Sequence, residues 1–161
     1  MEAFAQSIEG GTIYTWVTST SWLWPFMEIL HFIGLSLLLG ALLVIDLRMM
    51  GFFRAIDIRA IHTLLLWVFI GFALNLVTGI LFFFGDPMRY AVHAGFQLKM
   101  VLILLAGINA VWYSWKIHPA MQEWDANVNP PAPAKLVGSI SLVLWLSILL
   151  LGRLIPYVST G

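Results

Sequence analysis

Few polar side chains in this chain could do chemistry, and most of them interrupt long apolar runs. An ionisable or amide side chain inside a bilayer is costly, so a residue of this kind marks a functional site by default. The residues that meet this description are Glu28, His31, Asn75, His93, Lys99, Asn109 and Arg153. The chain contains no hydrolytic or phosphate-binding motif, so we expect an electron-transfer protein rather than an enzyme.

The four histidines sort into two pairs by their expected depth. If the first and third apolar runs begin at the same membrane surface, a rise of roughly 1.5 Å per residue places His31 about 14 Å and His93 about 9 Å below it. His62 and His118 fall near the opposite surface. Haem iron takes axial imidazole, and helix bundles build such sites from facing helices. The spacing therefore predicts haem b, one or two per protomer, with one histidine pair at each site.

Neighbouring residues favour the outer pair. On a helical period Gly34 lies one turn from His31, where the lack of a side chain would leave room for a flat macrocycle. His93 lines up with Gln97 and Met100 in the same way, so Met100 is a further cofactor-binding candidate. A haem also carries two propionates, for which the outer half offers three cations: Arg89, Lys99 and Arg153.

Each of these residues also has an ordinary structural interpretation. An intramembrane imidazole can simply bond to a neighbouring helix, and histidines at an interface are common. Glu28 and Lys99 lie at compatible heights, so a buried ion pair between them is one alternative. Gly71, Asn75 and the residues one turn further on could pack a helix contact, within the protomer or across a dimer.

The composition excludes whole classes of protein. Of the 161 residues 61% are hydrophobic and only 10% are charged, with a mean hydropathy of +0.93. A soluble domain carries about a quarter charged residues, so a water-soluble globule and a nucleic-acid binder are both excluded. No cysteine is present, which excludes disulfides, thiolate metal sites and iron–sulfur clusters. We expect an integral membrane protein of one domain, 1–161, in contact with the lipid bilayer.

Four apolar runs are long enough to cross a bilayer, which takes about 20 residues. They predict an all-α bundle of four transmembrane helices at about 22–47, 62–85, 87–117 and 135–157. Asp86-Pro87 is typical of a helix start, and Pro119 predicts that the backbone leaves the helix at His118. Residues 3–20 predict a short N-terminal interfacial helix and a connector, broken at Gly10-Gly11.

The distribution of Lys and Arg predicts the orientation. Five basic residues fall on one side, which are Arg48, Arg54, Arg59, Lys116 and Lys135, and three on the other, which are Arg89, Lys99 and Arg153. The side with more positive charge is expected to be cytoplasmic, so both termini are expected on the periplasmic side of a bacterial inner membrane.

The first apolar run carries Glu28-Ile29-Leu30-His31 and ends in Asp46-Leu47-Arg48-Met49-Met50-Gly51. With these segments the chain resembles a family of uncharacterised bacterial four-helix inner-membrane proteins, over about residues 22–151. Other matching positions are Gly40, Gly71, Phe72, Thr78, Gly79, Phe82, Asp86, Pro87, Tyr90, Phe96, Lys99 and Asn109. The resemblance implies a small inner-membrane bundle with a link to redox or respiratory systems. The general layout is also similar to that of small di-haem b-type cytochromes.

At one place the chain departs from that family. It has His93-Ala94-Gly95 where the family pattern is an Asn-Pro. The resemblance therefore favours His31 as a ligand but not His93, in which case Lys99, Met100 or a residue of a second protomer would supply the other ligand.

The sequence thus predicts a transmembrane b-type cytochrome that carries electrons within or across the membrane. We expect a redox partner or quinone, and a homodimer formed through seams of small residues. Two alternatives stay open. One is a proton or solute transport module that uses Glu28 and Lys99, and the other is a structural subunit that anchors a larger complex.

Overall fold

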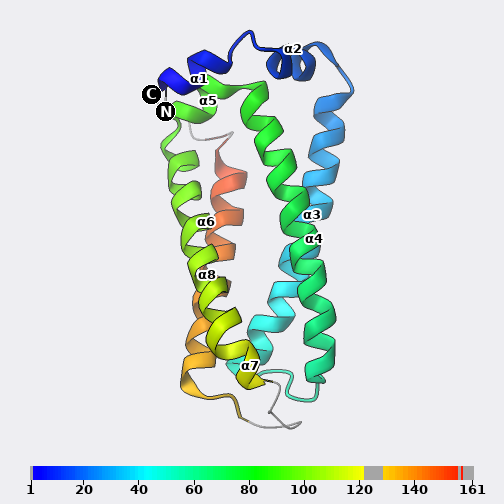
Figure 1. The fold of residues 1–161 in the computed structure, drawn as a ribbon, viewed down its shortest axis with the longest axis vertical. Coiled ribbons are helices and arrows are strands. Elements are labelled where there is room, and N and C mark those ends of the chain that lie inside the picture. Colours follow the sequence, from blue (N-terminus) through cyan, green and yellow to red (C-terminus); the bar gives the residue numbers. More distant parts are fainter. Residues whose placement is uncertain (1, 122–128, 156, 158–161) are drawn as a thin grey trace.

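The computed structural model describes residues 2–121, 129–155 and 157, and for Ile58 and Arg59 it describes the backbone alone. The described part of the chain is helical (Figure 1). Four helical segments are long and apolar enough to cross a membrane, which confirms the predicted fold class. These are α3 (Leu23–Met50), α4 (Ile58–Gly85), the segment Ala94–Met121 that begins with α6 (Ala94–Trp112), and α8 (Ala132–Leu154).

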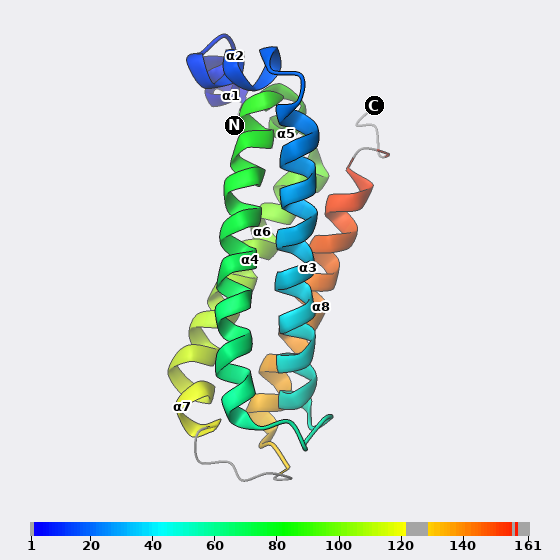
Figure 2. The ribbon, with the colours of Figure 1, turned by 90° about the vertical axis from the view of Figure 1, so that its right-hand side faces the viewer.

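The helices run up and down, and α1 and the last residues of α8 lie at the same end of the bundle (Figure 1). We call this the terminal end, and the end that carries the connection from α3 to α4 the loop end. The central helix is α3, which packs against α4 on one side and α8 on the other, while α6 packs against α8 (Figure 2). The packing order is therefore α4, α3, α8, α6, and α4 packs at most marginally against α6.

Two short helices close the terminal end. α1 (Glu2–Ile8) and α2 (Thr12–Ser19) lie across this end of the bundle (Figure 1). The break between them falls at Gly10 and Gly11, as predicted, and Gly10 has a φ of +79° that favours glycine. The expected connector after this break is itself helical, because Thr12 begins α2.

The third predicted helix is not continuous, which corrects the range 87–117. The chain forms α5 (Pro87–Val92) and then α6, and the backbone of His93 between them is extended, with ψ of 113°. His93 serves as the N-cap of α6, since its Nδ1 accepts a hydrogen bond from the Gly95 N–H at 3.1 Å. The expected alignment of His93 with Met100 on one helix therefore does not hold.

The prediction that the backbone leaves the helix at His118 is wrong. His118 has helical dihedral angles, and the chain passes from α6 through a π-helical turn, η1 (Tyr113–Ile117), into α7 (His118–Met121). Pro119 follows the π-helical turn directly, where the His118 N–H bonds to the Tyr113 carbonyl and the usual i→i−4 pattern is already interrupted.

The other helices begin earlier or end later than predicted. α3 continues to Met50 and stops at Gly51, whose φ of +100° gives the left-handed C-cap that glycine provides best. α8 begins three residues early because Pro133 fits within its first turn. The connection from α3 to α4 is correspondingly short.

The closest approach of two helices lies between α3 and α4. A Cβ atom at Gly71 would lie 2.6 Å from both the Gly34 carbonyl oxygen and the Leu38 backbone nitrogen. A Cβ at Gly34 would lie 2.7 Å from Asn75 Nδ2. The two backbones therefore touch with no side chain between them, as small residues at a membrane helix contact allow. The small residues of α4 at this level pack within the protomer.

Two apolar clusters hold the ends of the bundle. The larger one, at the loop end, joins α3, α4, η1, α7 and α8, and its buried members are Ile45, Met49, Ile61, Tyr113, Ile117, Met121, Ala134 and Val137. The smaller one, at the terminal end, consists of Val17, Leu23 and Met27 with Trp24, Leu81 and Phe82 packed against it. Between these clusters, the rings of Phe72 on α4 and Trp145 on α8 meet edge to face at 6.4 Å.

The backbone contact predicts a strong effect of a single methyl group. Gly71→Ala should lower the free energy of unfolding by about 1–3 kcal/mol, because α3 must move away to admit the Cβ. Gly40→Ala on α3 is the matched control, since nothing lies within 4 Å of its Cβ position. Reversible unfolding in mixed micelles measures both. Equal stability of the two variants would contradict the contact.

Candidate functional site

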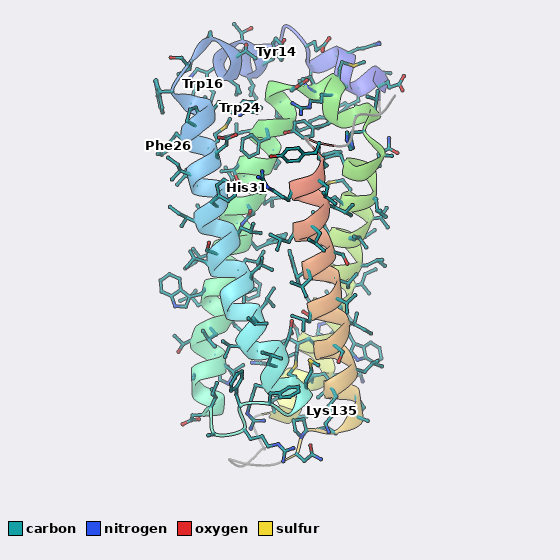
Figure 3. All side chains as sticks on the ribbon, turned by 180° about the vertical axis from the view of Figure 1, so that it is seen from behind. Tyr14, Trp16, Trp24, Phe26, His31 and Lys135 are labelled. Atoms are coloured by element: carbon teal, nitrogen blue, oxygen red, sulfur yellow. The ribbon has the colours of Figure 1, made fainter. Side chains whose placement is uncertain are left out.

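His31 is held by a hydrogen bond that crosses from α3 to α4. Its Nδ1 lies 2.7 Å from Thr78 Oγ1. The Thr78 hydroxyl donates its own proton to the Leu74 carbonyl oxygen, also at 2.7 Å, so it accepts from His31. This network assigns the proton of the neutral imidazole to Nδ1. Nε2 then carries a lone pair, and Figure 3 shows the ring on the side of α3 that faces the inside of the bundle.

Aromatic rings surround the imidazole on the side of the terminal end. Phe82 of α4 meets the His31 ring edge to face, with 5.5 Å between ring centroids. Trp24 packs on Phe82 at 5.2 Å, and its indole N–H donates to Glu28 at 3.2 Å. Glu28 is exposed, and the expected ion pair between Glu28 and Lys99 is not formed. Asp86 and Arg89 do form an ion pair at this end of the bundle.

Lys99 supplies a positive charge to the same region. It is partly buried on α6, and its ammonium group interacts electrostatically with His31. Its Nζ reaches α8, where a Cβ at Gly152 would lie 3.2 Å away. No carboxylate pairs with it in the described part of the chain. A cation in an apolar interior needs an anionic or polar partner, so this position favours a ligand that carries negative charge.

The other two predicted cations lie at the surface. The Arg89 guanidinium is 3.8 Å from the Asp86 carboxylate, and both side chains are about half exposed. Arg153 is exposed and lies over the Tyr157 ring, 5.2 Å from its centroid. Of the three expected propionate partners, Lys99 is therefore the one that the structure brings to His31.

The terminal end is capped by stacked rings that connect α4 to α6. Phe83 stacks on Phe96 at 5.8 Å and on Phe4 at 6.4 Å, and Tyr90 packs on Phe96 at 5.3 Å. Burial raises the pKa of the Tyr90 hydroxyl above its ordinary value, so this group stays protonated at neutral pH. These rings form an apolar cover on the side of His31 that faces the termini.

His93 and Met100 are less well arranged to bind iron. His93 is only 6% exposed, and its Nδ1 lone pair already accepts from Gly95. The proton of a neutral ring then lies on Nε2, which leaves no free nitrogen lone pair. Met100 is 38% exposed. The structure also fills the space beside Gly34 with α4, so the expected room for a macrocycle at that residue is absent.

The inner histidine pair meets directly. His118 Nε2 lies 3.1 Å from His62 Nδ1, and the two rings are edge to face with 4.8 Å between centroids. The depth prediction correctly paired these residues. Imidazoles that hydrogen-bond to each other leave no space for a macrocycle between them, so this arrangement does not fit an inner haem.

In the terminal half of the bundle, His31 offers a nitrogen lone pair and Lys99 a cation, which are two of the groups that a haem would need. His93 and the His62–His118 pair are less suitable, because His93 caps α6 and the other two rings contact each other. A transition-metal ion held by side chains alone fits poorly, because the described residues contain no group of three His, Asp or Glu side chains that could hold one.

Sequence reasoning missed a second set of buried polar groups, at the loop end. Asp46 is 1% exposed with neither carboxylate oxygen hydrogen-bonded, and Arg48 is fully buried with both terminal nitrogens unpaired. The Tyr113 hydroxyl is also buried without a partner. A signal was available for Asp46, because helical periodicity places it on the buried face of α3 with Ile45 and Met49.

No family model, curated protein or solved structure matches this chain. Its own residues are therefore the evidence for what it does.

The His31 hydrogen bond can be tested by deleting the hydroxyl. Thr78→Val should lower the free energy of unfolding by about 0.6–1.7 kcal/mol, the range for hydrogen bonds between membrane helices, and should change the 15N shifts of the His31 ring. Thr63→Val, at an exposed position of α4, is the control. A Thr78→Val protein with the stability and His31 spectrum of the wild type would show that Thr78 does not hold the imidazole.

Proposed function

We propose that the protein is a b-type haem protein that carries electrons within or across the bacterial inner membrane, with one haem in the terminal half and His31 as an axial ligand. The observation that carries this proposal is the hydrogen-bond chain from His31 through Thr78 to the Leu74 carbonyl. Histidines that bind metals almost always donate their second ring N–H in this way, which orients the ring and raises the basicity of the free nitrogen.

Each residue of the site has a defined role in this proposal. His31 binds iron through Nε2, and Thr78 keeps the imidazole in the required tautomer. Lys99 binds a propionate, which would give its buried charge the anionic partner that no described carboxylate provides. Phe82 and the ring cover of the terminal end exclude water from this side. The bound haem supplies reversible one-electron oxidation and reduction.

A second protein ligand to iron would have to come from Lys99, from Met100 or from a residue of a second protomer. Met100 is the less well arranged of the two residues on α6, because it is 38% exposed. His93 would first have to give up its hydrogen bond from Gly95. We therefore expect His93→Ala to keep the pigment.

The proposal includes the surroundings of the protein. The excess of Lys and Arg at the loop end supports a cytoplasmic position for that end and a periplasmic position for both termini. A haem in the terminal half would then exchange electrons with a periplasmic partner or with quinone in the outer leaflet. Gly79 has open space at its Cβ position, so this face of α4 is available for a homodimer contact.

Absorption spectroscopy of the purified protein tests the proposal. Expression with ample haem should give a Soret band with sharp α and β bands on reduction, and a pyridine haemochrome assay should give about one haem per chain. His31→Ala should lose the pigment, because it removes the only protein ligand that we assign. Glu28→Gln, one turn away on the exposed side of α3, is the matched control and should keep the spectrum.

A colourless wild-type protein would contradict this proposal. It would leave the two alternatives, a structural subunit and a transport module. Co-purification with a larger enzyme in fixed ratio would favour a structural subunit. A pH-dependent flux into liposomes that Glu28→Gln abolishes would favour a transport module.

A further inference from the structure

A second group of buried polar side chains lies at the loop end, away from the His31 site. The carboxylate of Asp46 on α3 is enclosed, and neither of its oxygens has a hydrogen-bond partner. The Tyr113 hydroxyl, from the first residue of η1, is buried and unpartnered as well, and the residue is 8% exposed. Burying such groups unpaired in an apolar interior is costly, so packing alone does not explain why they are buried here.

These groups face one another from three helical elements. Tyr113 packs in one apolar cluster with Ile45, the neighbour of Asp46 on α3, and interacts electrostatically with the Asp46 carboxylate. The Ser141 hydroxyl of α8, which is 6% exposed, also faces this carboxylate, although neither carboxylate oxygen is hydrogen-bonded at good geometry. Oxygen atoms of α3, η1 and α8 therefore lie near one another, although the Asp46 carboxylate and the Tyr113 hydroxyl form no hydrogen bond.

Close contacts between helices bring the elements of this cluster together. A Cβ at Gly138 would lie 2.9 Å from the Asp46 carbonyl oxygen, so α8 meets α3 at this level with no side chain between them. The Asn109 amide donates to the Val137 carbonyl at 3.2 Å and fastens α6 to α8 one turn before Tyr113. Tyr113 then begins the π-helical turn, a distortion that occurs frequently at functional sites.

Among the side chains that the structure describes, no cation forms an ion pair with the carboxylate. Arg48 is the nearest one along α3, but its Nε approaches the Ile56 carbonyl at 3.4 Å, and it forms no ion pair with Asp46. The His118 ring contacts the ring of Tyr113 at 5.8 Å and pairs with His62. The carboxylate therefore faces two neutral hydroxyls, and the buried Arg48 guanidinium does not pair with it.

That chemistry suits one class of ligand. Carboxylate and hydroxyl oxygens are hard ligands that prefer hard cations over soft ones. Ca²⁺ takes six to eight oxygens, commonly from several carboxylates, whereas this cluster has one carboxylate. Protonation would neutralise Asp46 but would still leave the Tyr113 hydroxyl without a partner. A monovalent cation between the oxygens would balance the charge and give both side chains a partner.

We propose that Asp46, Tyr113 and Ser141 bind a sodium ion inside the loop half of the bundle. The site is independent of the His31 site, since it shares no residue with it. Sodium bound between three elements would join α3, η1 and α8 and stabilise the folded protein by mass action.

The experiment uses the full-length protein in detergent, with Na⁺ as the probe. At constant pH and ionic strength, NaCl should raise the thermal unfolding temperature relative to choline chloride and KCl, and radioactive 22Na⁺ should bind saturably. Asp46→Asn should abolish both effects. Tyr113→Phe and Ser141→Ala each remove one oxygen and should weaken Na⁺ binding at least about tenfold.

Matched controls separate loss of the ion from loss of the fold. Ser139→Ala on α8 removes a hydroxyl that bonds to its own helix at the Lys135 carbonyl, and Tyr14→Phe removes one at the terminal end. Both should bind Na⁺ like the wild type. If Asp46→Asn does not fold, the two single-oxygen variants decide the question. Equal stability in Na⁺ and choline, or a response to pH alone, would overturn the proposal.

Discussion

The contact between the backbones of α3 and α4 at Gly34 and Gly71 is the constraint on which the His31 site depends. Because no side chain separates these helices, the His31 ring can reach the Thr78 hydroxyl, which in turn bonds to its own helix. A Cβ at either glycine would move the helices apart, and the His31 ring could then no longer bond to the Thr78 hydroxyl. A comparable contact at Gly138 draws α8 onto the other side of α3. The central helix is therefore held between two glycine contacts.

The two polar sites differ in charge and lie in opposite halves of the bundle. The terminal half combines an imidazole with an ammonium group and has no described carboxylate paired with it, which suits a ligand with anionic groups. The loop half combines a carboxylate with hydroxyls, and no described side chain forms an ion pair with that carboxylate, which suits a cation. Between these levels the contact of Phe72 with Trp145 is apolar. The terminal site therefore favours a ligand with negative charge and the loop site a cation. The Lys99 ammonium group and the Asp46 carboxylate do not pair with each other.

Local backbone chemistry explains where the predicted helices failed. A run of apolar residues suggested one helix over 87–117, but the His93 imidazole caps a new helix by accepting from Gly95. Pro119 suggested an end, yet it follows a π-helical turn in which the usual i→i−4 hydrogen-bond pattern is already interrupted. In both cases local hydrogen bonding, which the sequence pattern does not show, decided the path of the backbone. The histidine depths were more informative, because they correctly paired His62 with His118.

The sequence by itself determined the fold class, because a backbone in hydrocarbon must satisfy its own hydrogen bonds and an apolar run of sufficient length can do so only as a helix. It also marked His31 and Lys99, since polar side chains are conspicuous in such runs. Only the tertiary structure decided which partners these residues have. In the structure His31 bonds to Thr78, and Glu28 does not pair with Lys99. Tyr113 and Ser141 both face Asp46. The physical reason is that a partner across a helix contact depends on where two backbones can touch, which spacing within one helix does not specify.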